Sequence, residues 1–345
     1  MLKSDIKLTV LEDSIEFLEI DDSEYFSSKY ADYVSNSKLS LINPAQGGSI
    51  EKYETGFSGG SYSSAFEFGS AVHELVLQPE SFYLEENISK PTAKLGATVD
   101  AVFDFRKKGY SIMKSIRLAS DKVDYYKGKL TINVLKKLIK EGINYYLYLL
   151  HYTPIEGKDP IFLNTKDQIR LKECVKSISE NRIVKKLLNP DYIFTKPINV
   201  NEGTLLLNVK AEYKGKEYIL KLKSKLDNFI IDFESNTLYL NDLKTTGHYV
   251  SQFSDSFTKF HYSRQMAMYF WMLRLYIKKQ YPQFKPQHFY ANMLVVSTIP
   301  DHQSKVYHVT TKDQEEGMNE FSYLLRCVVK LLADERDLDT EFINI

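Results

Sequence analysis

The sequence is poor in cysteine, and this argues against two classes of protein. Its 345 residues include only Cys174 and Cys327. Two thiols in a chain of this length do not form a disulfide scaffold. They also cannot supply the four thiolates that an iron–sulfur cluster normally needs, so we expect no such cluster. Both residues are expected to be buried thiols in a reducing compartment.

Long apolar runs and an excess of one charge are also missing. No segment has the roughly 20 consecutive apolar residues of a membrane span, and residues 1–22 lack the pattern of a secretory signal. The 45 basic side chains balance the 45 acidic ones, whereas proteins that bind nucleic acid broadly are usually basic. We therefore expect a cytoplasmic protein without membrane contact, and any nucleic-acid contact would come from a local patch.

The sequence does have enough apolar residues for a large core, since 43% of it is hydrophobic and it contains 25 Tyr and 20 Phe. Apolar residues at helical or alternating spacing predict the order of the elements. Helices are expected over 64–78, within 101–152, and over 166–187, 256–280 and 313–334. Strands are expected within 204–232, with a turn at Lys214-Gly215, and over 237–246, 289–298 and 304–311, with loops over 43–64 and 86–100.

This order predicts a mixed α/β (α+β) fold, with a central mixed β-sheet flanked by helices and a helical elaboration before the sheet. Residues 1–30 would form an acidic arm or a strand pair. One domain would cover 31–335, with the elaboration at about 100–160 and the sheet that carries the motif below at about 204–246. Residues 336–345 would be a tail.

The main chemical motif is Asp242-Leu243-Lys244, at the end of an expected strand. Residues two apart on a strand face the same side, so Asp242 and Lys244 would project together. A hairpin turning at 234–236 would bring Asp227 to the same end of the sheet. Two carboxylates suit Mg²⁺ or Mn²⁺, and a lysine beside them can position an attacking water or offset phosphate charge. An isolated Asp-x-Lys is more often a solvated ion pair.

Two further groups of residues have both a functional and a structural interpretation. Gln265 and Tyr269 would share a helix face with Tyr262, where they could contact a phosphate or a base. The alternative is a half-buried tyrosine edge. His73 would lie on the same helix face as Gly69 and could add an imidazole to the metal. The alternative is a structural histidine.

In combination, these motifs resemble a known family. The order is G-x-x-x-H at 69–73, then Asp227, D-x-K-T-T at 242–246 and Q-x-x-x-Y at 265–269. It resembles the RecB-like branch of the PD-(D/E)XK nuclease superfamily, and most closely the RecE-type exonucleases (exonuclease VIII) of phages and prophages. The similarity extends over about residues 30–300.

The resemblance implies a restriction-endonuclease-like core and Mg²⁺- or Mn²⁺-dependent hydrolysis of DNA that leaves a 5′-phosphate. Members of the family degrade one strand of a duplex from its 5′ end in recombination and leave a 3′ tail for a single-strand annealing protein, often as homo-oligomers. A phage- or prophage-encoded protein in the cytoplasm of a bacterial host is implied. The implied roles are metal binding by His73, Asp227, Asp242 and the Leu243 backbone carbonyl, catalysis by Lys244, and DNA contact by Gln265, Tyr269 and Tyr262.

The sequence departs from the family at two acidic positions. For the glutamate expected before the first core strand, Glu212 and Glu202 are both candidates, and Leu294–Pro300 contains no glutamate where another is expected. Three alternatives stay open. The chain could be a PD-(D/E)XK endonuclease or a CRISPR-adaptation-like nuclease without a cluster, a non-catalytic DNA-binding or assembly protein with this fold, or an unrelated α/β protein.

Overall fold

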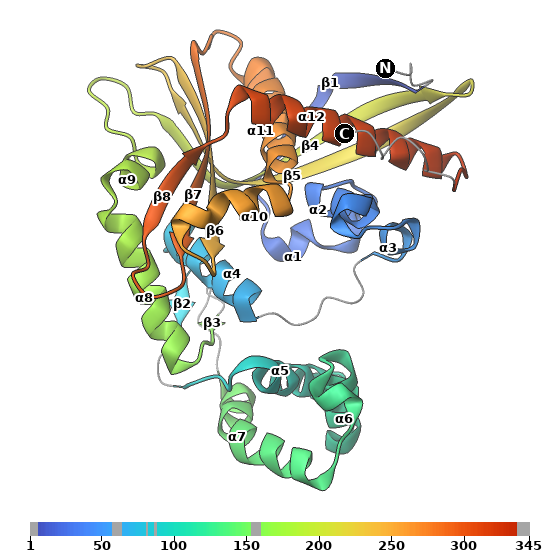
Figure 1. Cartoon of the computed structure of the whole chain (residues 1–345), viewed down its shortest axis with the longest axis vertical. Coiled ribbons are helices and arrows are strands. Elements are labelled where there is room, and N and C mark those ends of the chain that lie inside the picture. Colours follow the sequence, from blue (N-terminus) through green and yellow to red (C-terminus); the bar gives the residue numbers. More distant parts are fainter. Residues whose placement is uncertain (1–5, 57–63, 81, 86–87, 153–159, 337–345) are drawn as a thin grey trace. The chain divides into compact units, whose positions relative to one another are not determined.

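The computed structural model describes residues 6–56, 64–80, 82–85, 88–152 and 160–336 (Figure 1). The chain divides into two compact units. The first, which we call the sheet unit, consists of Met1–Ser58 and Ile178–Ile345, and the second, the helical unit, is Gly59–Ser177. A single domain over 31–335 stays a prediction.

The sheet unit is built on a six-stranded mixed sheet, in the order β1-β4-β5-β6-β7-β8. Strands β6 and β7 are parallel, and every other neighbouring pair is antiparallel. The sheet therefore confirms the expected mixed α/β class. The strands are β1 (Lys7–Leu18), β4 (Ile198–Tyr213), β5 (Lys216–Asp232), β6 (Thr237–Thr246), β7 (His288–Ser297) and β8 (Ser304–His308).

Helices flank this sheet, and the two longest, α11 and α12, pack against each other (Figure 1). Apolar side chains of β4, β5, α11 and α12 form the main core, which includes Leu207, Leu222, Met268 and Leu324. The helices of the sheet unit are α1 (Asp22–Tyr25), α2 (Asn36–Ile42), α3 (Ile50–Thr55), α9 (Arg182–Leu188), α10 (Phe253–Lys259), α11 (Tyr262–Gln280) and α12 (Thr311–Leu332).

The helical unit has its own small core. Leu95, Val99, Ala119, Leu138 and Tyr145 are among its buried residues. The expected helical elaboration corresponds to three of its helices, α5, α6 and α7. Its elements are α4 (Ser64–Leu77), β2 (Tyr83–Leu84), α5 (Ala93–Lys107), α6 (Ile112–Lys122), α7 (Ile132–His151), β3 (Pro160–Ile161) and α8 (Thr165–Glu180), the last of which extends into the sheet unit.

The expected strands and the Lys214-Gly215 turn are confirmed, except that the last strand ends at His308 and Thr311 already begins α12. Residues 213 and 216 pair across the turn, and Lys214 and Gly215 have φ values of 48° and 74°. Such left-handed conformations give a two-residue turn whose twist matches that of the strands. Residues 7–18 form β1, which pairs with β4 rather than with a second strand of the N-terminal segment.

Two predicted helices are each divided in the structure. The 166–187 prediction is wrong at Asn181, whose side chain accepts hydrogen bonds from the backbone N–H groups of Ile183 and Val184 and so begins a new helix. The 256–280 prediction is wrong at His261, whose φ of 53° interrupts the helical backbone. The expected loops at 43–64 and 86–100 contain α3 and the start of α5, respectively.

No helix in the part of the chain that the structure describes could cross a membrane, because none combines the length and the apolar character required.

The contact between α11 and α12 depends on Gly317. A Cβ atom at this position would lie 2.2 Å from the carbonyl oxygen of Ser263. We expect Gly317→Ala to push the helices apart and to lower the free energy of unfolding by about 1–3 kcal/mol in urea denaturation. Glu316→Ala, at the exposed neighbouring position, is the control. An unchanged or higher stability of Gly317→Ala would contradict this close helix contact.

Candidate active site

The site begins where β5 and β6 separate. Asn228 pairs with Asn241, and this is the last regular pair of the two strands at this end. The next residues would be Asp227 and Asp242, but the Asp227 Oδ2 atom accepts a hydrogen bond of 2.7 Å from the backbone N–H of Leu243. The side chain thus satisfies a backbone donor that the neighbouring strand does not reach.

A third carboxylate joins this position from β4. Asn201 pairs with Asn228 and Gly203 with Leu226, which leaves Glu202 opposite Asp227. Glu202 has a φ of 56°, so the strand is locally distorted at this residue. Carboxylate oxygens of Glu202 and Asp227 lie within 4.8 Å of one another.

Lys244 and Gln265 contact Asp242 from two sides. The Lys244 Nζ atom lies 2.6 Å from Asp242 Oδ2, and Gln265 Nε2 donates a hydrogen bond of 2.8 Å to Asp242 Oδ1. The ammonium also lies 5.5 Å from the centroid of the Tyr262 ring, within cation–π range. Asp242 itself is buried, so its orientation is determined by these partners.

The electrostatics of the cluster follow from burial and from the charges of neighbouring side chains. Burial raises the pKa of Asp227, and burial together with the Asp227 charge raises the pKa of Glu202 to about 7. Burial alone would lower the pKa of Lys244, but Asp242 and Asp227 raise it above its ordinary value. Burial also raises the pKa of Tyr269 well above 10.0. Lys244 and Tyr269 therefore stay protonated at neutral pH, beside a cluster that would be stabilised by a cation.

The oxygen donors suit a hard divalent ion. Glu202, Asp227 and Asp242 lie at one position of the sheet, on the neighbouring strands β4, β5 and β6. Carboxylates of this kind are the ligands that Mg²⁺ and Mn²⁺ prefer. The side chains present therefore fit the metal that the sequence analysis expected.

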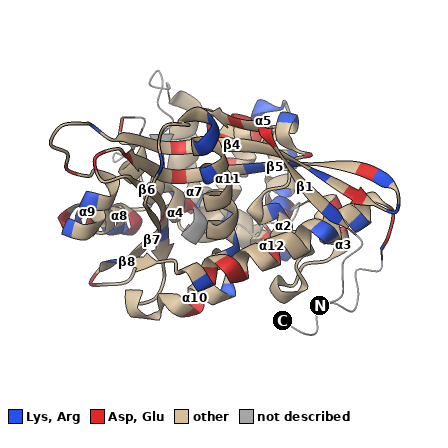
Figure 2. Ribbon diagram, turned by 90° about the horizontal axis from the view of Figure 1, so that it is seen from above, with Lys and Arg blue, Asp and Glu red and all other residues tan. Residues whose placement is uncertain are grey.

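The structure does not bring Glu212 to this position. It lies ten residues beyond Glu202 on β4, about 33 Å along an extended strand. There it pairs with Lys210 at 3.3 Å and Lys7 at 3.8 Å, and Figure 2 shows acidic and basic residues mixed along this part of the β4–β5 hairpin. Of the two glutamates considered, Glu202 is the one beside Asp227.

The structure gives different information on each of the other predicted site residues. Tyr269 experiences the charges of Asp242 and Asp227, which places it near the cluster. Leu243 contributes its backbone N–H to Asp227, and metal binding by its carbonyl stays a prediction. His73 lies on α4 of the helical unit, and its role as a metal ligand also stays a prediction.

Buried asparagines on the opposite face of the sheet hold the strands in register. Asn241 Nδ2 donates to Asn228 Oδ1, and Asn292 Nδ2 donates to Asn241 Oδ1, both at 2.8 Å. Asn241 Nδ2 also donates to the Leu187 carbonyl of α9 at 2.8 Å. Successive residues of a strand face opposite sides, so Asn228 and Asn241 anchor the strands directly behind Asp227 and Asp242. Sequence analysis missed this row because asparagines on separate strands form no local pattern.

Arg264 supports the helix that carries Gln265. Its side chain is fully buried. Its guanidinium donates to Asn36 Oδ1 at 2.8 Å, Ser40 Oγ at 2.7 Å and Glu320 Oε1 at 2.7 Å. It thus joins α2, α11 and α12, and holds the start of α11 in place. An arginine in the otherwise uncharged first half of α11 was the signal available in the sequence, since a buried guanidinium requires partners.

Comparison with protein-family models and with curated proteins finds no match. Among solved structures, the chain is similar to the crystal structure of a "Putative exonuclease" from Eubacterium rectale. The two are 12% identical, the similarity covers 92% of this chain and 88% of that chain, and the TM-score is 0.46. This likeness is too low to carry an argument about function.

Because the pKa of Glu202 is raised, we predict that the metal-free cluster destabilises the folded protein more at high pH than at low pH. The pKa rises from 4.5 to about 7 on folding, so the stability contributed by the protonated form is fully present below pH 4.5 and is lost as the pH rises through about 7. In EDTA, Glu202→Gln should therefore gain Tm relative to the unmodified protein between pH 5 and pH 8, by about 2–4 °C or more.

Thermal unfolding by circular dichroism at several pH values measures this difference. Glu212→Gln, which removes a carboxylate from the same strand outside the cluster, is the matched control. A constant Tm difference between Glu202→Gln and the unmodified protein across this range would contradict the prediction.

Proposed function

We propose that the protein is a Mg²⁺-dependent DNA nuclease of the PD-(D/E)XK type that hydrolyses phosphodiester bonds. The observation that supports this most is the meeting of Glu202, Asp227 and Asp242 with Lys244 at one position of the sheet. Oxygen ligands for a divalent ion next to a charged lysine suit hydrolysis of a phosphodiester.

Glu202, Asp227 and Asp242 would hold the ion, which when bound would polarise the phosphate and lower the pKa of a water molecule. Lys244, kept protonated by its carboxylate neighbours, would move its ammonium from Asp242 toward a phosphate oxygen and offset the negative charge that develops there. Asp242 would keep its orientation through the 2.8 Å hydrogen bond from Gln265.

The tyrosines would act on the substrate side of the cluster. Tyr269 stays a neutral phenol, and its O–H could donate to a phosphate without adding charge. Tyr262 would hold the Lys244 ammonium against its ring. Direct contact of Gln265 with DNA, which the resemblance implies, remains part of the proposal and would add to its role in orienting Asp242.

The finer assignment follows the resemblance of the motifs to RecE-type enzymes. We propose 5′→3′ digestion of one strand from duplex ends in phage-type recombination. Its partners would be DNA, a single-strand annealing protein and further copies of the chain. The balanced net charge agrees with contacts confined to the surroundings of the site rather than spread over the surface.

An end-labelled linear duplex tests the activity. With Mg²⁺, we expect stepwise loss of 5′-terminal nucleotides, and with EDTA no digestion. Lys244→Ala and Glu202→Gln should each lower the rate by about a hundredfold or more, since the first removes the ammonium that would offset the phosphate charge and the second removes a ligand of the ion. Glu212→Gln should keep the full rate, because it lies on the same strand but outside the cluster.

The form of the products separates the alternatives. Cutting of closed circular DNA would replace the exonuclease by an endonuclease. Tight DNA binding without hydrolysis, unaffected by Lys244→Ala, would indicate a non-catalytic DNA-binding protein. Equal rates for Glu202→Gln and Glu212→Gln would remove the carboxylate cluster from the mechanism.

Metal binding can be measured without DNA. Because the ion would bind only the folded cluster, millimolar Mn²⁺ should raise the Tm of the unmodified protein and of Glu212→Gln by several degrees. The increase should be smaller or absent for Glu202→Gln and Asp227→Asn. Equal increases for all four proteins in thermal unfolding would show that the ion binds elsewhere.

A further inference from the structure

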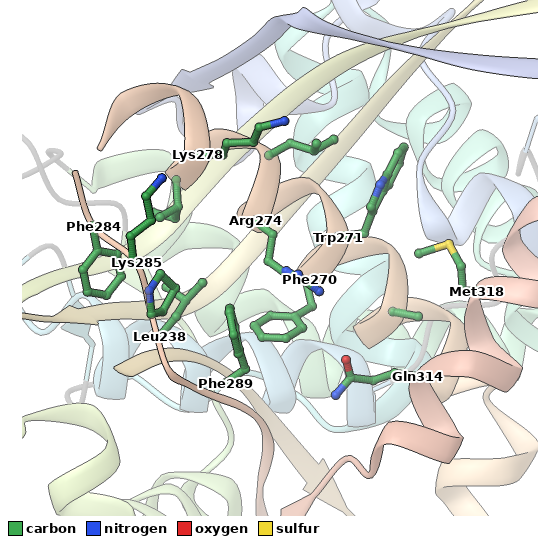
Figure 3. Close-up of a pocket in the computed structure, with 14 residues that line it drawn as sticks. Leu238, Phe270, Trp271, Arg274, Lys278, Phe284, Lys285, Phe289, Gln314 and Met318 are labelled. Carbon is green, nitrogen blue, oxygen red and sulfur yellow. The ribbon is translucent and has the colours of Figure 1, made fainter. Parts of the chain in front are cut away.

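A pocket outside the candidate active site lies on the sheet unit, between α11, α12 and the first residues of β6 and β7 (Figure 3). Its volume is about 460 Å³, within the range of small-molecule sites in proteins. Its side chains come from segments that belong to one compact unit. None of the described residues in its wall takes part in the carboxylate cluster.

Aromatic rings form much of the wall. The rings of Phe270 and Phe289 lie 6.0 Å apart and nearly perpendicular, at 82°. Trp271 and Phe284 add two more rings (Figure 3). Phe289 is 39% exposed although it is a large apolar side chain. A flat apolar ligand would cover it and remove this apolar surface from water.

The charged side chains of the wall are all basic. They are Arg274, Lys278 and Lys285, and none of the described lining residues is acidic. The Arg274 guanidinium lies 4.9 Å from the centroid of the Phe289 ring. Lys278 pairs with Glu12, but both side chains are more than half exposed, so solvent screens this pair strongly. The pocket therefore favours a ligand that carries negative charge next to its apolar part.

The pocket is separate from the candidate active site. Arg274 follows Gln265 by nine residues, which is two and a half helical turns, so the two side chains leave opposite sides of α11. Phe289 pairs with Leu238 near the start of β6. Lys244 lies six residues further along that strand, about 20 Å away.

We propose that this pocket binds one nucleotide, with its base among the aromatic rings and its phosphate against Arg274 and Lys285. Stacking on aromatic side chains next to cations is how proteins hold the bases of single-stranded nucleic acid. Arginine suits this role because its planar group both stacks on a ring and donates to phosphate oxygens. The nucleotide can be a free nucleoside 5′-monophosphate or one unit of a single strand.

The chain has its own probe for this binding, since Trp271 is its one tryptophan and lines the pocket. The fluorescence of Trp271 is followed in EDTA, so that nucleotide binding through a metal at the carboxylate cluster does not contribute to the signal. The probes are thymidine 5′-monophosphate, thymidine, inorganic phosphate and a short oligothymidylate. We expect saturable quenching by the monophosphate or the oligonucleotide, and binding weaker by about tenfold or more for thymidine and for phosphate alone.

The variants test the pocket itself. Arg274→Gln, at an exposed helix position, should weaken nucleotide binding by about tenfold or more. Lys216→Gln, an exposed lysine at the β4–β5 hairpin, should leave binding unchanged. Lys244→Ala should bind the nucleotide probes as tightly as the unmodified protein does. Loss of nuclease activity with intact quenching would therefore affect only the proposed function.

The two nucleotide probes identify the source of the ligand. Tighter binding of the oligonucleotide indicates a single strand, and equal or tighter binding of the monophosphate indicates a free nucleotide. The proposal is overturned if neither quenches Trp271 saturably, or if Arg274→Gln binds both as well as the unmodified protein.

Discussion

The hydrogen bond from the Leu243 N–H to the Asp227 carboxylate is the interaction on which the candidate site depends. It marks the point at which β5 and β6 stop pairing through their backbones. Beyond it, side chains replace the regular ladder, and carboxylates can converge where backbone groups would otherwise meet. Glu202 enters the same opening because its left-handed backbone breaks the regularity of β4. Such local departures from ideal backbone geometry cost free energy, and they persist only where the surrounding structure holds them in place.

That surrounding structure acts on both faces of the sheet. On one face, the Asn228–Asn241–Asn292 row ties three strands together with buried hydrogen bonds. On the other, Arg264 and the close contact at Gly317 fix α11, so that Gln265 reaches Asp242. A buried polar network that is fully hydrogen-bonded is rigid, because any displacement leaves a donor or an acceptor unpaired. Burial raises the pKa of both Asp227 and Glu202, and the nearby Asp227 charge adds to the effect at Glu202, so this rigidity keeps two carboxylates close together in a buried position.

Helix α11 has a different role on each of its sides. Its Gln265 side faces the carboxylates, and its Arg274 side lines a basic, aromatic pocket. Because a helix is stiff over this length, both surfaces keep a constant spacing of about 14 Å along its axis. Under the two proposals, a strand of DNA at one surface and a nucleotide at the other would be held at this fixed spacing.

The sequence alone determined the parts of the molecule that depend on short-range periodicity. Alternation with a period of two placed Asp242 and Lys244 on one face of a strand, and Lys214-Gly215 located the hairpin turn, because both follow from backbone geometry over a few residues. The tertiary structure alone decided which distant groups meet. Glu202 and Glu212 are equivalent as sequence candidates on one strand, yet only Glu202 lies opposite Asp227. The helix breaks at Asn181 and His261 were also missed, since a cap or a left-handed residue can override apolar spacing that would fit one continuous helix. Register, strand separation and burial are properties of the assembled sheet, and no local pattern contains them.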